Sequence, residues 1–290
     1  MGGLNRKHRR AGKQFRPKPR DAYRILPIPF RAQFDALAVL GGFANHVSMS
    51  QVGLPTTVSG SLASMVFAKS CAHARSIGAI AVQSSMFDHH AIMSLTRMIL
   101  EASTMIAYLL DPVSDDEWAF RHTVLKLHDT VSRIKLLRSF NAPSDDLRTG
   151  REELKSIIIT SPIFSSLPKD RQNRLTNGED MFVIGMRTVA TKIMGWNETK
   201  FMGIYAYFSA HTHSAPMSFV RMANHEIDYY HPSYAQISTL ALSLEVSLAC
   251  LRRSMLRMID EHPEQIPLYH PDLLTDARQQ DAESPFFAVD

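Results

Sequence analysis

Apolar residues recur every three to four positions through most of this chain, and almost no stretch alternates apolar and polar residues as a strand does. The pattern begins at Pro29 and continues to about Glu261. The sequence therefore predicts an all-α fold, a single large helical bundle of about seven to nine helices. We expect the helices over residues 88–112, 114–140 and 233–261 to form the centre of the bundle. The expected helices cover approximately residues 31–48, 58–77, 88–112, 114–140, 144–159, 186–194, 197–214 and 233–261.

Two helix starts carry specific signals. Asp88 precedes a long apolar run as an N-cap, and Pro112 follows the end of that run. Ser114 and Glu117 have the spacing of a capping box, in which each side chain bonds the other residue's backbone N–H.

Charge divides the chain into three parts. Residues 1–20 hold eight Lys or Arg and no acid, which leaves 24 basic and 28 acidic residues in the remainder. From Asp260 to the end, eight acidic residues face one base, Arg278. We expect a disordered basic arm over residues 1–25, a bundle domain over 29–262 and an irregular acidic tail over 263–290.

Several function classes have no support in the sequence. The two cysteines are far apart, and no phosphate-binding glycine loop, HExxH or GxSxG motif occurs. Asp88, His89 and His90 could be combined with His73 and Glu101 as metal ligands. However, we expect the adjacent histidines to diverge on a helix and Asp88 to serve as a cap. Neither a metal site nor a cofactor is therefore expected.

The uncharged stretch between Asp35 and Lys69 raises the question of a membrane span. It contains polar residues and a turn-like GLPTT segment, and it never offers the roughly 18 unbroken apolar residues that a span requires. We expect no membrane association and a cytoplasmic location.

Arg97 and Glu101 are the only charged residues between His90 and Leu110. They are four positions apart and so share one face of a helix that is otherwise apolar. A helix of this kind is normally buried, and buried charges need polar partners. We therefore expect one or both side chains to contact another helix.

The stretch YAYFSAHTHSAP, residues 205–216, offers such partners. On a helix Tyr205, Ser209 and His213 form one stripe, whereas His211 points elsewhere. We expect His213 or Ser209 to lie within hydrogen-bond reach of Arg97 or Glu101. The candidate site is thus a polar cluster of Arg97, Glu101, Tyr205, Ser209 and His213 that is either ligand-binding or structural.

The segments RMILEASTMIAYL and YAYFSAHTHSAP together resemble a bacterial all-helical family known as domain of unknown function 5677. Its Arg-x-x-x-Glu and Tyr-x-x-x-Ser-x-x-x-His patterns, the second followed by a small residue and Pro, match the five cluster residues and Pro216. The resemblance covers roughly residues 60–255. It implies an all-helical fold with a polar cluster joining two helices and implies no established activity.

A looser resemblance is to the HEPN group, which includes RNA-cutting toxins. RMIDEH supplies Arg257 and His262 at a spacing used by that group, but Met258 stands where a polar residue is usual. We interpret this match as incidental.

Three classes of function remain open. The first is a binding protein whose polar cluster holds a small polar ligand or stabilises the core. The second is an RNA-directed effector of stress or phage defence that contacts RNA or DNA through residues 1–20. The third is a hydrolase that uses Ser209 and His213 as nucleophile and base. A homo-oligomer also stays open.

Overall fold

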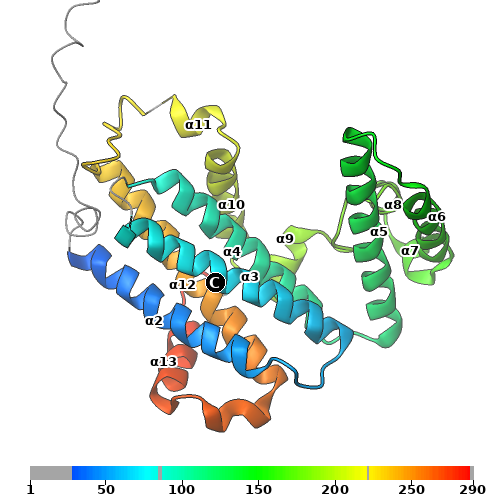
Figure 1. The fold of residues 1–290 in the computed structure, drawn as a ribbon, viewed down its shortest axis with the longest axis horizontal. Coiled ribbons are helices and arrows are strands. Elements are labelled where there is room, and N and C mark those ends of the chain that lie inside the picture. The colour runs from blue at the N-terminus through cyan, green and yellow to red at the C-terminus, as the bar shows by residue number, and fades with distance from the viewer. Residues whose placement is uncertain (1–27, 84–86, 221, 288–290) are drawn as a thin grey trace, which may run out of the picture. The chain divides into compact units, whose positions relative to one another are not determined.

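The computed structural model describes residues 28–83, 87–220 and 222–287, and all regular structure in these ranges is helical. The helical bundle expected from the sequence is present, but it is divided into two compact units (Figure 1). Unit 1 combines the chain up to Ile106 with Met202–Phe286, and unit 2 contains Ala107–Phe201 and the residues from Phe287 on. The helix expected over 114–140 belongs to unit 2 and is not part of the core of unit 1.

Helix α12 is the centre of unit 1. It packs against α2, α3, α13 and the 3₁₀ helix η2, and α2 also packs against α3. A capping box begins α12, because the Ser233 hydroxyl accepts from Gln236 N and the Gln236 side chain accepts from Ser233 N. The elements that lie wholly or mostly in this unit are α2 (Ile28–Ser50), α3 (Val58–Gln83), α4 (His89–Leu109), α10 (Glu198–Thr212), α11 (Pro216–Phe219), α12 (Tyr234–Glu261), η2 (Pro263–Leu268) and α13 (Pro271–Ala282).

Buried hydroxyl groups join α4 to α12. Thr96 Oγ1 lies 3.0 Å from Ser247 Oγ, and the Ser254 hydroxyl donates to Ser103 Oγ at 2.9 Å. Ser103 in turn donates to the carbonyl of Cys250. Each of these buried polar groups therefore has a partner across the helix interface.

By length and composition alone, α4 and α12 are the two described helices that could cross a membrane. In the most apolar 18-residue stretch of each helix, 61% of the residues of α4 and 50% of those of α12 are buried inside the protein. The core helices of a bundle meet the same criterion, because their apolar faces are covered by neighbouring helices.

The expectation of an irregular tail over 263–290 is wrong for most of that segment. Residues 263–268 form η2, and residues 271–282 form α13. Arg253 of α12 makes an ion pair with Asp281 of α13 at 2.8 Å, and Arg252 donates to Gln280 at 2.7 Å. The acidic composition suggested a solvated tail, whereas these acidic and polar side chains bond arginines of α12. The basic arm lies outside the described residues.

Unit 2 has its own apolar core between α5, α6 and α8, formed by Phe120, Val124, Leu127, Val131, Ile158, Leu175 and Val183. At the start of α5 the Ser114 hydroxyl accepts from Glu117 N, as expected. The other half of the expected capping box is not formed in the described structure, because the Glu117 carboxylate accepts from Arg121 and not from Ser114 N. Because several short helices were not expected, the described residues contain more helical segments than the seven to nine predicted from the sequence. The elements are α5 (Asp115–Ser139), α6 (Asp145–Thr160), α7 (Pro162–Ser166), α8 (Lys169–Thr176), α9 (Met186–Thr188) and the π-helix η1 (Val189–Ile193).

Candidate functional site

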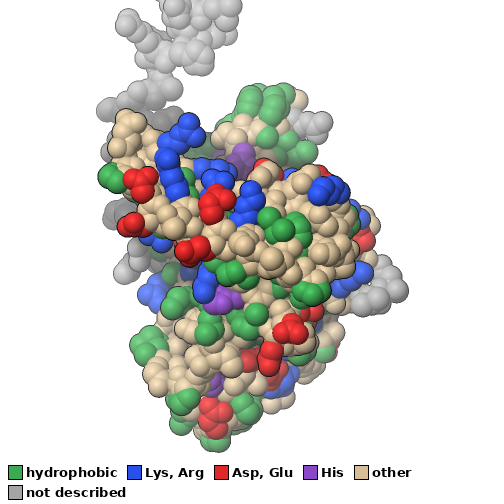
Figure 2. Space-filling view, turned by 90° about the vertical axis from the view of Figure 1, so that its right-hand side faces the viewer, with side chains coloured by type: hydrophobic (Ala, Val, Ile, Leu, Met, Phe, Trp, Pro, Cys, Tyr) green, Lys and Arg blue, Asp and Glu red, His purple; other side chains and the backbone are tan. Residues whose placement is uncertain are grey.

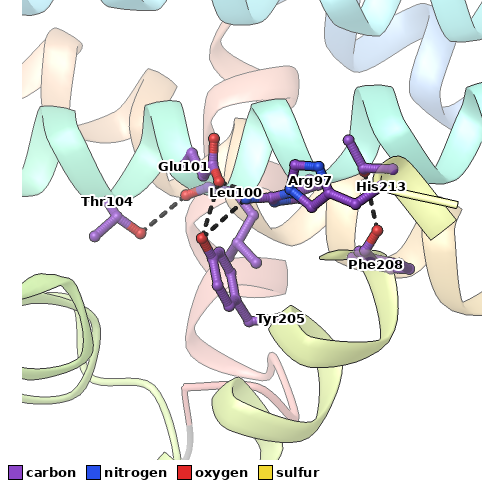
Figure 3. A network of polar contacts seen from close by, with 8 residues as sticks. Arg97, Leu100, Glu101, Thr104, Tyr205, Phe208 and His213 are labelled. Carbon is purple, nitrogen blue, oxygen red and sulfur yellow. Dashed lines mark hydrogen bonds and ion pairs between the residues drawn. The ribbon is translucent and has the colours of Figure 1, made fainter. Parts of the chain in front are cut away.

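Four of the five residues expected to form a polar cluster lie together in unit 1 (Figure 3). Arg97 Nε donates to Glu101 Oε1 at 2.9 Å along α4. Arg97 Nη2 and the hydroxyl of Tyr205 are 3.1 Å apart, and that hydroxyl donates to Glu101 Oε1 at 3.1 Å. His213, the first residue after α10, places Nε2 2.7 Å from Arg97 Nη1. We call these four residues the Arg97 cluster.

The contact expected between the two polar stripes is therefore present. Its geometry determines which ring nitrogen of His213 accepts a hydrogen bond. A guanidinium only donates hydrogen bonds, so His213 Nε2 must accept, which places the ring proton on Nδ1.

Ser209 does not join the cluster. Its backbone carbonyl accepts from His213 N within the helix, and no described residue hydrogen-bonds its hydroxyl. The Ser209–His213 nucleophile–base pair is absent, because His213 Nε2 is used by Arg97.

The Arg97 cluster is also less buried than the apolar pattern of α4 predicts. The side chains of Arg97 and Glu101 are 14% and 34% exposed, and His213 is exposed. The buried face of α4 carries Thr96, Ile99 and Leu100, whereas Arg97 and Glu101 lie toward the edge of its contact with α10. All three nitrogen atoms of the guanidinium have protein partners, so the cluster is a closed connection between two helices.

A second arrangement lies on another stripe of the same two helices. His90 in the first turn of α4 and His211 near the end of α10 share a hydrogen bond between their Nδ1 atoms, which are 2.9 Å apart. His89 packs against His90 with ring centroids 3.9 Å apart, and Tyr207 packs its ring against His211 at 4.8 Å. As expected, His211 does not join His213, which lies on the other stripe.

The expectation that His89 and His90 diverge is wrong. Both residues are in the first turn of α4, where no earlier helical turn restricts their side chains, and helical side chains lean toward the N-terminus. Asp88 caps this helix as expected, since its carboxylate accepts from Ala91 N at 3.0 Å.

These histidines line a pocket of about 400 Å³, which we call the histidine pocket. Its volume lies in the range of pockets that hold small organic ligands. The lining residues are His89, His90, Tyr207, His211, Pro216, Met217, Ser218, Val220, Met222, His225, Ile227, Ala235, Gln236 and Thr239.

The segment between α10 and α12 supplies half of this lining. Phe87 N, just before α4, donates to the carbonyl of Tyr229 at 2.6 Å. Asp228 N donates to the side chain of Gln236, in the first turn of α12, at 3.1 Å, so this segment is bonded near the starts of both helices. Ser214 and Glu226 have φ angles of 51° and 50°, which only a few per cent of residues other than glycine adopt. Such backbone conformations are concentrated at binding and catalytic sites.

Burial keeps the pocket histidines neutral. Burial, together with smaller contributions from the neighbouring His90 and His211, lowers the pKa of His89 to about 3. Burial, followed by the charge of His90, lowers the pKa of His211 to about 4. Burial also lowers the pKa of His90, with Asp88 acting in the opposite direction. At neutral pH the three imidazoles are therefore uncharged.

The other candidate residues from the sequence lie outside the Arg97 cluster and the histidine pocket. His262 is buried at the end of α12, with Nδ1 3.2 Å from Glu264 Oε1. Within the ranges that the structure describes, no group of three or more His, Cys, Asp or Glu residues is arranged to hold a metal ion. Cys71 and Cys250 are buried thiols whose pKa is raised by burial.

The chain matches no family model, no curated protein and no solved structure.

Proposed function

We propose that the protein is a non-catalytic binding module that holds a small organic molecule in the histidine pocket of unit 1. The observation that carries this proposal is the pocket itself, about 400 Å³ in volume, whose apolar walls surround a hydrogen-bonded pair of neutral imidazoles. A concave apolar site with a few convergent polar groups is the usual form of a small-molecule site.

In this proposal the Arg97 cluster is the structural support of the pocket. Its hydrogen bonds join α4 to α10, the two helices that bring His90 and His211 together. The cluster offers a ligand little, because the guanidinium of Arg97 and the carboxylate of Glu101 already bond protein groups.

Catalysis receives less support than binding. The Ser218 hydroxyl donates to the carbonyl of Ala215, and the hydroxyls of Tyr207 and Thr239 bond each other at 3.0 Å. A hydrolytic serine needs a base within hydrogen-bond reach. The described residues provide no such base for Ser209 or Ser218.

The proposal can be tested with N-phenyl-1-naphthylamine, an uncharged probe whose fluorescence rises in apolar surroundings. We expect saturable binding to the full chain. Ala235→Phe should weaken binding at least about tenfold, because the added ring enters the pocket. Ala206→Phe makes the same change at an exposed position of α10 and should leave the affinity unchanged. Equal affinities for both variants would contradict the proposal.

The basic arm supports a second candidate, an RNA-directed effector. The eight Lys or Arg of residues 1–20 would attract phosphates, whereas Figure 2 shows acidic and basic side chains interspersed on one face of the folded part. Deleting residues 1–20 should then lower RNA affinity and flatten its salt dependence. Identical salt profiles for the two proteins would remove this candidate.

A further inference from the structure

The charge of the histidine pocket restricts what it can bind. The described lining contains no Asp, Glu, Lys or Arg, and burial keeps His89, His90 and His211 uncharged at neutral pH. Three carboxylates are close in sequence: Glu226 is exposed and is not part of the lining, and the other two have local roles. Asp88 caps α4, and Asp228 accepts from Tyr230 N at 2.7 Å and from His231 N at 3.3 Å. A charged ligand would lose its hydration in the pocket without gaining an opposite charge from these residues.

The histidine pair adds a second restriction. Two neutral imidazoles can share one hydrogen bond between their Nδ1 atoms only if one Nδ1 carries the proton and the other accepts. The two Nε2 atoms must then have opposite roles: one accepts and the other donates. Neither Nε2 atom has a hydrogen-bond partner among the described residues. The pair can therefore offer a ligand both a donor and an acceptor, without charge.

The rest of the lining is mainly apolar. Met217, Val220, Met222 and Ile227 come from the segment between α10 and α12, and the Tyr207 ring packs edge-on against His211. Methionine side chains adapt to flat aromatic surfaces and contact them favourably through sulfur. These walls suit a compact apolar body, in particular an aromatic one.

We propose that the ligand of the histidine pocket is an uncharged molecule with an apolar, aromatic-sized body and one polar group that both donates and accepts hydrogen bonds. A primary amide is the simplest group of this kind. This inference rests on the proposed function, since it assigns the chemical class of the molecule held at that same site.

Four naphthalene derivatives of similar size separate the contributions of charge and hydrogen bonding. They are 1-naphthamide, the nearly isosteric 1-naphthoate anion, the 1-naphthylmethylammonium cation and unsubstituted naphthalene. Each is titrated at pH 7.5 against the full chain holding N-phenyl-1-naphthylamine, and displacement of the probe gives the affinity.

The amide should bind at least about tenfold more tightly than either ion, because each ion must be desolvated without compensation. It should also bind more tightly than naphthalene. His211→Phe should reduce the ratio of amide to naphthalene affinity, since the ring remains while its nitrogen atoms are lost. His270→Phe is the matched control at an exposed position outside the pocket and should keep that ratio.

The outcomes separate this inference from the proposed function. If either ion binds as tightly as the amide while Ala235→Phe still blocks the probe, the ligand class is wrong and the binding module stands. If the ratio is the same in His211→Phe and in the parent, the imidazole pair does not recognise the polar group. Failure of the probe and of all four compounds to bind overturns both proposals.

Discussion

Lowering the pH from 7.5 to 5.0 should destabilise unit 1, and His89 alone should account for about 2 kcal/mol of that loss. The residue is only 3% exposed, and burial lowers its pKa from 6.5 to about 3. Gln236 Nε2 lies 3.3 Å from His89 Nδ1, so the neutral ring also has a hydrogen-bond partner that a protonated Nδ1 would lose.

The sign of the effect follows from the direction of this shift. Above pH 6.5 His89 is neutral in both states and contributes nothing. Below pH 6.5 the unfolded chain binds a proton that the folded protein does not, so the free energy of unfolding falls as the pH falls. The loss is about 1.36 kcal/mol per pH unit, and the 1.5 units between 6.5 and 5.0 give about 2 kcal/mol. The loss levels off only near the folded-state pKa.

Hydrogen exchange read by mass spectrometry can measure this loss in unit 1 alone. The opening free energies of α4 and α12 would be compared at the two pH values after correction for intrinsic exchange rates. Both tryptophans, Trp118 and Trp196, belong to unit 2, so their fluorescence reports the stability of that unit separately.

The substitution His89→Asn removes the titrating ring and keeps an oxygen that can accept from Gln236. In this variant the opening free energy of α4 should fall by about 2 kcal/mol less between the two pH values than in the parent. His270→Asn, at an exposed histidine, is the control and should behave as the parent does. If His89→Asn and the parent lose the same opening free energy, His89 is not the group that links folding to pH.

Two further predictions concern charged groups, one in each unit. Glu101→Ala should destabilise unit 1 by about 1–2 kcal/mol, because it removes the acceptor of two hydrogen bonds at a partly exposed position. The double change Arg97→Met with Glu101→Leu should cost less than Glu101→Ala, since no charge is left without a partner; hydrogen exchange of α4 measures both. Arg121→Leu should destabilise unit 2 by about 2–3 kcal/mol, measured by urea unfolding followed by tryptophan fluorescence. The Arg121 side chain is 3% exposed and makes ion pairs with Asp111 and Glu117, so an unchanged midpoint would show that these contacts are not stabilising.

The helices were predictable where local signals begin and end them. The cap at Asp88 and the capping residue Ser114 are determined by side chains a few positions apart, and both were identified from the sequence. Helix α13 was missed because its acidic composition is typical of a solvated tail. Its stability includes the ion pair between Arg253 and Asp281, which are 28 positions apart and are brought together only by the fold. The division into two units was also missed, because no Gly- or Pro-rich linker in the sequence marks the boundary between them.

The Arg97 cluster was predictable for a different reason. Two charges on an otherwise apolar helix require polar partners, and one polar stripe, Tyr205 to His213, was available to provide them. The histidine pocket offered no comparable signal. His90 follows a cap residue at the start of a helix, and His211 stands two positions from the more prominent His213. Only the fold shows that His90 and His211 face each other.

The Arg97 cluster and the pair of His90 and His211 are linked physically, because both depend on the placement of α10. Residues two positions apart on a helix point in different directions, so His211 and His213 contact different residues of α4, His90 and Arg97. When Arg97 holds His213 and Tyr205, it fixes both the position and the rotation of α10 against α4. That rotation places His211 Nδ1 2.9 Å from His90 Nδ1, and a hydrogen bond of this length tolerates little displacement. We therefore infer that the Arg97 cluster positions the uncharged pair, so that the proposed chemistry of the pocket depends on residues that do not line it.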